Sequence, residues 1–136
     1  MAQAYPVRMS TSLKTQQVVF ALDCPDARAL ADFYARLLGW QIGPASEDWV
    51  NVVPPEGTTA GFHIACQQID DYRAPEWPTG STPQQAHMDF YVNSIAEAEP
   101  LAIASGAIKH TVQPSDDGQF AVFTDPAGHP FCLCEH

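Results

Sequence analysis

Acid, base and thiol side chains recur at two-residue spacing in two short apolar segments of this chain. His87 and Asp89 are two residues apart in one segment, and Cys132 and Cys134 are two apart in the other. Side chains at this spacing share one face of a β-strand. An aspartate beside an imidazole orients it and favours its charged form, so the pair is suited to general acid–base catalysis. We predict His87, Asp89 and a third base candidate, His63, as catalytic residues.

Aromatic and amide side chains fall on the same strand faces as these titratable groups. Aromatic walls with a few polar groups are typical of small-molecule pockets. The solvated face of an antiparallel sheet stays the alternative. The chain has no Gly-x-Ser-x-Gly elbow and no phosphate-cradling glycine loop, so nucleophilic acyl transfer and nucleotide binding are not indicated. The predicted ligand-binding residues are Trp49, Asn51, Gln67, Tyr72, Trp77, Tyr91 and Cys132.

The elements that position these residues can be predicted from spacing and punctuation. In the first half, an apolar run over 18–22 predicts a strand, and apolar residues at three- and four-residue spacing predict a helix over 26–38. Asp23 or Asp26 would cap this helix, and Gly39 would end it. Strands are predicted over 49–53 and 61–68, with a further short strand near 40–42.

The second half repeats this order. A strand over 87–92 is followed by Asn93 or Ser94 as a cap, a helix over 95–105, and closing strands over 120–124 and 130–135. Pro100 removes one amide donor, so we expect this helix to begin late or to kink. The corresponding positions are Val19 and His87, Asp26 and Ser94, and Gly39 and Gly106.

This repeat predicts an α+β fold of two tandem βαβββ modules. Module one covers about 17–69 and module two about 87–135, within one domain over 17–136 that follows a flexible tail, 1–16. The linker over 70–86 is punctuated by proline and glycine. Its aromatic residues, Tyr72 and Trp77, either anchor the linker or cover the mouth of a cavity between the modules, where they would stack on a ligand.

The amino-acid composition limits the classes of binding partner and the cellular compartment that we expect. Six Lys and Arg residues against 16 Asp and Glu give a net charge of −10, which disfavours nucleic acid and anionic membranes as partners. The four cysteines lack C-x-x-C spacing, and the N-terminal segment has no continuous apolar run. We therefore predict a cytoplasmic protein with reduced thiols. Exposed sheet edges favour a homodimer.

The turn before the last strand carries a family resemblance. Asp-Pro followed by glycine is turn chemistry, and alternating residues follow it as a strand. This segment, the 33–40 helix end and the 72–78 linker resemble the vicinal oxygen chelate superfamily, which contains glyoxalase I, bleomycin-resistance proteins and extradiol dioxygenases. They are most similar to a glyoxalase-like subgroup common in bacteria. The most specific run is Asp125-Pro126-Ala127-Gly128-His129-Pro130-Phe131-Cys132-Leu133.

The resemblance implies paired modules whose sheets curl into a mixed, incompletely closed barrel with the helices outside. In its metal-dependent members, four strands each supply one ligand, at positions that look like Val19, Gln67, His87 and Cys132 here. Only His87 is a ligand of the usual kind. We therefore predict no metal and no other cofactor. Two metal clusters stay as alternatives: His63 with His87 and Asp89, and Cys132 with Cys134 and His136.

These observations favour a small-molecule protein whose cavity lies between the modules. It would sequester a ligand, as bleomycin-resistance members do, or catalyse a modest acid–base step. The alternative is a metal-dependent lyase, isomerase or dioxygenase of the same superfamily, so enzymatic activity stays open. A third interpretation is a structural dimer with a collapsed cavity. Other histidines have structural interpretations: His129 would satisfy loop carbonyl groups, and His110 would lie on an exposed edge.

Overall fold

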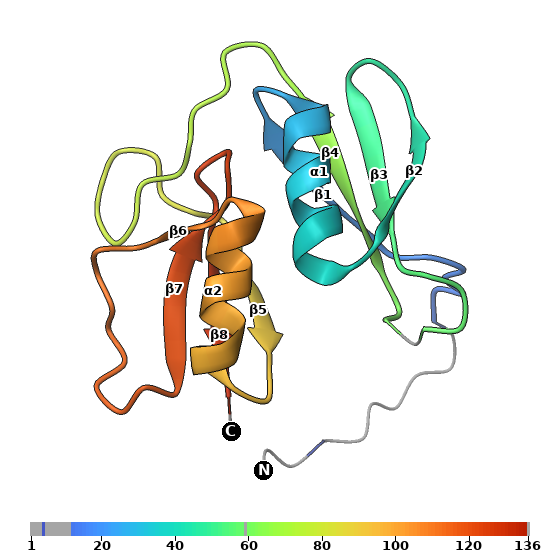
Figure 1. Ribbon diagram of the computed structural model, residues 1–136. Helices are drawn as coiled ribbons and strands as arrows, with labels where there is room; N and C mark the ends of the chain where they lie inside the picture. Colours follow the sequence, from blue (N-terminus) through green and yellow to red (C-terminus); the bar gives the residue numbers. More distant parts are fainter. Residues whose placement is uncertain (1–3, 5–11, 59, 136) are drawn as a thin grey trace.

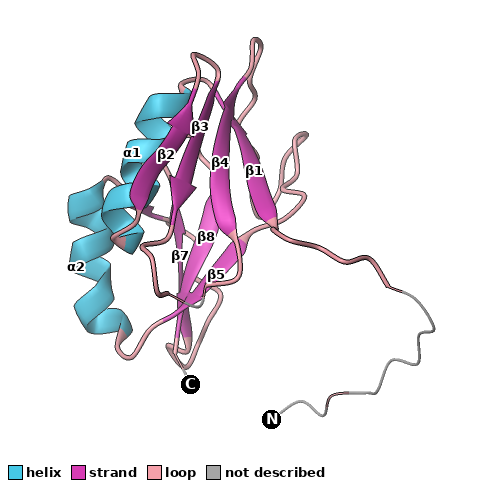
Figure 2. Ribbon diagram, turned by 90° about the vertical axis from the view of Figure 1, so that its right-hand side faces the viewer, coloured by secondary structure: helices cyan, strands magenta, loops and turns pink. Residues whose placement is uncertain are grey.

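The fold consists of two similar modules that lie side by side, each with one helix packed on a four-stranded sheet (Figure 1). The computed structural model describes residues 4, 12–58 and 60–135. The predicted tail therefore lies largely outside the described residues. In Figure 2 both helices lie on the same side of the sheets, which leaves the opposite sheet faces uncovered by helix.

Module one forms a mixed sheet with the strand order β1-β4-β3-β2, in which β1 is parallel to β4. The predicted helix and all of the predicted strands are present, including the short strand after Trp40. Its elements are β1 (Val19–Cys24), α1 (Ala27–Leu38), β2 (Gln41–Ala45), β3 (Trp49–Val53) and β4 (His63–Gln68).

Module two repeats this topology with the strand order β5-β8-β7-β6, and β5 is parallel to β8. The predicted α+β fold of two βαβββ modules is confirmed, and the two sheets do not close into one barrel. The two-residue strand β6 was not predicted. The elements are β5 (Met88–Tyr91), α2 (Ile95–Ser105), β6 (Ile108–Lys109), β7 (Phe120–Thr124) and β8 (Pro130–Cys134).

Both helices are capped as their sequences predict. Asp26 accepts a hydrogen bond from the Ala29 amide, and Ser94 accepts one from the Glu97 amide. Of the two outcomes expected from Pro100, a late start or a kink, the late start was wrong: α2 begins at Ile95 and contains the proline. Only one carbonyl loses its amide donor to a proline in the middle of a helix, and the capped first turn is unaffected.

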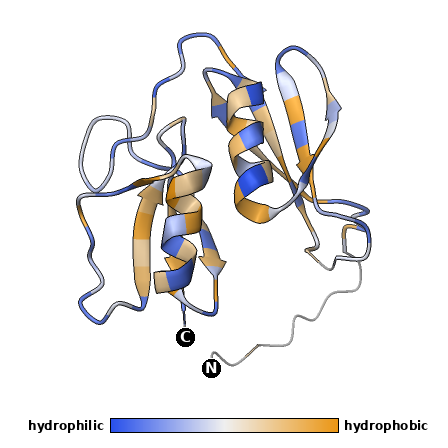
Figure 3. Ribbon diagram, viewed as in Figure 1, coloured by the Kyte–Doolittle hydropathy of each residue, from blue (hydrophilic) through white to orange (hydrophobic). Residues whose placement is uncertain are grey.

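The core lies between the helices and the sheet faces that pack against them. Phe33 and Tyr34 of α1, Ile64 of β4 and Phe131 of β8 are fully buried in it. Figure 3 shows hydrophobic colours along β7, in contrast to the hydrophilic loop that precedes it. Strand alternation predicts that Phe20 packs beneath the helix, but this prediction was wrong: Phe20 is 52% exposed, because β1 is an edge strand of its sheet.

A buried carboxylate joins the two modules to the linker. Asp125 Oδ2 accepts hydrogen bonds from the Tyr34 hydroxyl of α1 at 2.6 Å and from His129 Nδ1 at 2.8 Å. Its Oδ1 accepts from the amides of Ala127 and His129. The Tyr72 hydroxyl donates to the Ala127 carbonyl. The His129 side chain thus contacts a carboxylate and a hydroxyl group instead of the predicted loop carbonyls, since the turn folds back on Asp125.

The described residues contain no helix that is long and apolar enough to cross a lipid bilayer. The two helices have 12 and 11 residues, whereas a span needs about 20 apolar residues.

Candidate functional site

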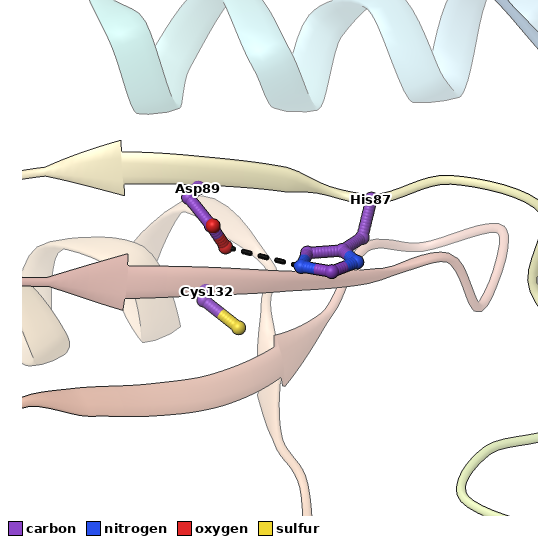
Figure 4. Close-up of side chains that lie close together, drawn as sticks. All are labelled: His87, Asp89 and Cys132. Atoms are coloured by element: carbon purple, nitrogen blue, oxygen red, sulfur yellow. Dashed lines mark ion pairs between the residues drawn. The ribbon is translucent and has the colours of Figure 1, made fainter. Parts of the chain in front are cut away.

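The predicted acid–base pair is formed at the start of β5. His87 Nε2 lies 3.2 Å from Asp89 Oδ1, and both side chains are partly exposed (Figure 4). Asp89 is opposite Cys132 in the parallel pairing of β5 with β8. One ligand atom from each of the three residues lies within 4.8 Å of the other two. The structure therefore agrees with the prediction that side chains two residues apart lie together on one face of the sheet.

Two adjoining hollows lie over this face of the four-stranded sheet of module two, which is called sheet two below. The larger, of about 350 Å³, is lined by His87 and Asp89 together with Tyr91, Gln119, Phe120, Cys132, Cys134 and Glu135. The smaller, of about 220 Å³, shares His87, Phe120 and Cys132 with it and is mainly apolar. Trp77, Gln84, Pro114, Pro130 and Val122 complete its walls.

A small apolar cluster forms the floor of these hollows, on the sheet face opposite the main core. Buried Val122, Cys132 and Cys134 pack there against Trp77 of the linker and Phe120 of β7. The Trp77 ring also meets His110 edge-on, with 5.0 Å between ring centroids. Trp77 therefore anchors the linker and at the same time walls the hollow beside His87, so both interpretations of this residue have a structural basis.

The two thiols on this face are protonated at neutral pH. Burial, followed by the negative charge of Asp89, raises the pKa of Cys132 to about 12. The same two causes raise the pKa of Cys134. A thiol with so high a pKa is neither a nucleophile nor a metal ligand until it ionises. Cys132 thus serves as a neutral wall of the site.

The predicted residues of module one lie elsewhere. His63 and Asn51 line a separate hollow with Gln17, and His63 Nε2 is 3.2 Å from Asn51 Oδ1. Trp49 donates to the same amide oxygen at 3.3 Å. Exposed Gln67 is paired with Trp49 in the β3–β4 register. The structure does not bring His63 into a hollow with His87, so a shared two-histidine cluster is not formed.

Tyr72 also lies apart from the His87 hollows. It lines another hollow, of about 320 Å³, under the linker beside Arg73. Its hydroxyl donates a hydrogen bond to the Ala127 carbonyl, in the turn that follows Asp125. Sequence reasoning missed Phe120 as a site residue, although its two-residue spacing from Val122 was a usable signal. It also missed Gln84, for which no sequence pattern gave a signal.

The metal site implied by the resemblance has no full donor set. His87 and Cys132 meet on module two, but Val19 has no donor atom and Gln67 does not line either hollow over sheet two. His136, part of the alternative zinc cluster, lies outside the described residues. Three donors of which one is a protonated thiol do not fit an octahedral ion held by four protein ligands.

The geometry agrees with comparisons to known proteins. A family model described as a glyoxalase-like domain matches residues 19–134. The chain belongs to the glyoxalase-like domain family. Solved structures that carry glyoxalase, bleomycin-resistance and dioxygenase names share its fold. No curated protein sequence matches it.

Solved structures share the fold of this glyoxalase-like protein at low sequence identity. A glyoxalase/dioxygenase from Nostoc punctiforme is 18% identical with a TM-score of 0.65, covering 98% of each chain. The antibiotic-binding protein TnmS3 from Streptomyces sp. CB03234 is 19% identical with a TM-score of 0.58, covering 94% of this chain and 98% of that one. The fosfomycin resistance protein FosX from Listeria monocytogenes is 16% identical with a TM-score of 0.63, covering 90% and 91%.

Proposed function

We propose that this glyoxalase-like protein binds a small organic molecule on the open face of module two, without the metal of its metal-dependent relatives. The observation that carries the proposal is the aromatic wall of Trp77 and Phe120 beside the His87–Asp89 pair. Apolar walls with a few convergent polar groups are the usual composition of a ligand pocket. The proposed binding face lies over the sheet of module two. A smaller hollow of about 130 Å³ lies between the modules, where the cavity was expected, and His87 lines it together with Phe20 and Leu22 of β1.

Two roles are compatible with such a site. Sequestration of a metabolite or drug is supported by structural relatives named as an antibiotic-binding protein and a fosfomycin resistance protein. A modest acid–base step is supported by Asp89, which holds the His87 imidazole at 3.2 Å beside the hollow. Both roles need His87, and turnover of the bound compound distinguishes them.

The first experiment combines ligand screening with metal analysis. Untagged wild type, His87→Ala and the matched module-one control His63→Ala are screened by thermal shift against aromatic metabolites and antibiotics, and their metal content is measured by elemental mass spectrometry. We expect ligand stabilisation in the wild type and in His63→Ala and its loss in His87→Ala, with no change in metal content. Equal stabilisation of all three proteins would contradict the site assignment.

A metal-dependent lyase, isomerase or dioxygenase is the second candidate. The observation that favours it is the gathering of donor atoms from His87, Asp89 and Cys132 within 4.8 Å. A divalent ion there would lower the pKa of the Cys132 thiol enough to ionise it. In this case the wild type carries close to one equivalent of metal, and His87→Ala removes it.

Trp77 gives a separate test of the pocket. Because Trp77 lies outside the main core, we expect Trp77→Ala to leave the melting temperature nearly unchanged yet to abolish ligand-induced stabilisation. Trp49→Ala, in module one, is the matched control and should keep the ligand response. A large loss of stability in the ligand-free Trp77 variant would mean that this residue only anchors the linker.

We also propose a cytoplasmic homodimer. The edge strand β1 exposes Val19 and Phe20, at 40% and 52%, which a second copy could cover. Sedimentation at micromolar concentration should give about twice 14.8 kDa, and a mass near 14.8 kDa would refute the dimer. If the protein were only a structural dimer, His87→Ala would destabilise it, and no compound would bind.

A further inference from the structure

The charges around the two hollows of sheet two have one sign. Asp89 and Glu135 line the larger hollow, and none of the described residues that line either hollow is lysine or arginine. The chain as a whole carries a net charge of −10. We infer that the ligand of this site is a planar aromatic compound bearing a protonated aliphatic amine. This inference rests on the proposed small-molecule function and names its ligand class.

The two carboxylates are not equivalent. Glu135 Oε2 accepts a 2.6 Å hydrogen bond from the Ile95 amide, so it is committed to the first turn of α2. The Asp89 carboxylate is 43% exposed, with the His87 imidazole on one oxygen at 3.2 Å. Asp89 therefore retains acceptor capacity toward the hollow, since a carboxylate offers about four lone-pair directions. It is the group that would pair with an ammonium.

A second acceptor lacks a donor near the same place. Gln84 lines both the smaller hollow and the linker hollow that contains Arg73, and its side-chain carbonyl oxygen is buried without a hydrogen-bond partner among the described residues. Buried polar atoms nearly always have partners, so an orphan acceptor indicates a missing donor. A ligand amine that carries two or three N–H groups supplies donors for Asp89 and, after a small rotation of its side chain, for Gln84. A carboxylate group in the place of the amine supplies none.

The aromatic half of the ligand follows from the smaller hollow. Its walls include Trp77, Phe120, Val122 and two prolines, Pro114 and Pro130, and they are mainly apolar. A flat ring fits between such walls, and the electron-rich face of an indole also attracts cations. His87 lies where the two hollows meet, because it lines both of them. The ring would occupy the smaller hollow and the ammonium would point toward Asp89.

The test uses three probes that share one ring and differ in charge. Naphthalen-1-ylmethylamine is a cation, naphthalen-1-ylmethanol is neutral and naphthalene-1-carboxylate is an anion, and each is titrated calorimetrically into the full-length protein. We expect the amine to bind at least tenfold more tightly than the alcohol, and the carboxylate to bind most weakly. Asp89→Asn should abolish the preference for the amine, and Asp89→Glu should restore part of it.

Controls separate this inference from the proposed function. Asp23→Asn, which removes an exposed carboxylate at the end of β1, should keep the preference for the amine. Raising the salt concentration from 0.05 to 0.5 M should reduce the preference, because salt screens partly exposed charge pairs. Equal affinities for the amine and the alcohol would overturn the inference while leaving an aromatic site in place. A preference for the amine that survives Asp89→Asn would also overturn it. Failure of all three probes to bind would count against both.

Discussion

The two modules are built on one plan but differ in what their open faces carry. In module one, Gln68 at the end of β4 accepts a hydrogen bond from the Ala27 amide at the start of α1. In module two, Glu135 after β8 does the same for the Ile95 amide of α2. Each module thus ties its last strand to the first turn of its own helix. The caps Asp26 and Ser94 complete the correspondence.

These caps allow the strands to be aligned without reference to other proteins. Counting back from Asp26 and Ser94 makes Val19 the counterpart of His87 and Ala21 the counterpart of Asp89. Counting back from Gln68 and Glu135 makes Ala65 the counterpart of Cys132, so the module symmetry selects Ala65 rather than the Gln67 that the family resemblance suggested.

The difference between the faces is therefore chemical rather than architectural. Where module two has imidazole, carboxylate and thiol, module one has two alanines and a valine. Positions that build the fold are matched, whereas positions that face a ligand are not. This asymmetry explains why the chemistry is confined to one sheet, and why half of a metal site shared between the modules has no donors.

The largest expected effect on stability comes from the Asp125 carboxylate, which connects the two modules. Asp125→Ala leaves the buried Tyr34 hydroxyl and two backbone amides without their acceptor. Removing one partner from a buried charged network costs about 3–5 kcal/mol. We expect a loss of this size in urea unfolding, with exposed Asp116→Ala as the matched control. A loss below about 1 kcal/mol would show that the modules are held together by apolar packing alone.

We expect Cys66, a core thiol of module one, to make stability fall at alkaline pH. Burial raises the pKa of Cys66 from 9.0 to about 12. Because the folded-state pKa is the higher one, stability is fully present below pH 9 and is lost as the unfolded chain ionises above it. The contribution of Cys66 should fall by about 2 kcal/mol between pH 8 and pH 10.5.

Unfolding of Cys66→Ala isolates this contribution. The variant pays a constant cost for its smaller side chain at all pH values, so its alkaline slope, and not its absolute stability, is the readout. We expect a shallower slope than that of the wild type. Parallel slopes would mean that other groups, such as Cys24 with its pKa raised to about 11 by burial, account for the alkaline loss.

The hydrogen bonds that tie each module's last strand to its helix allow a second comparison of the modules, with a smaller expected loss of stability. Gln68→Ala and Glu135→Ala should each destabilise the protein by about 1 kcal/mol, because each leaves a helix-terminal amide without its acceptor. Only the Glu135 effect should shrink at high salt, since a carboxylate also interacts with the positive end of the helix dipole. Urea unfolding at 0.05 and 1 M salt measures both. Equal salt dependence in the two variants would mean that the charge contributes nothing.

The sequence predicted the elements and faces of both modules because these depend on local pattern. Three- and four-residue spacing located α1, a cap residue and a terminal glycine located α2, and period two placed Cys132 and Asp89 on the same face. The two-residue strand β6 was missed because it is too short to show a period.

The arrangement of the modules could not be predicted, because it depends on contacts between distant residues. Tyr34 and Asp125 are 91 positions apart, and no local signal pairs them. The expectation that His63 and His87 meet failed for the same reason: it assumed that the two open faces enclose one cavity. The exposure of Phe20 likewise follows from the position of β1 at an edge of the assembled sheet, which periodicity does not specify.

The smallest expected effect concerns the reactivity of the Cys132 thiol on the open face of module two, at the position where module one has an alanine. Burial is the largest cause of the raised pKa of Cys132, and the charge of Asp89 is the next. Asp89→Asn removes that charge and therefore lowers the pKa, which increases the thiolate fraction at pH 8. A decrease of one pKa unit raises the thiolate fraction of Cys132 about tenfold. We therefore expect alkylation of Cys132 by iodoacetamide to accelerate by about three- to tenfold.

Peptide mapping by mass spectrometry separates Cys132 from Cys24 and Cys66, which have no exposed surface and should stay unmodified in the folded protein. Asp23→Asn is the matched module-one control, because Asp23 is only a minor cause of the raised pKa of Cys24 and does not act on Cys132. An unchanged rate in Asp89→Asn would assign the protection of Cys132 to burial alone. The open face of module two would then differ from that of module one in its residues but not in its electrostatic field.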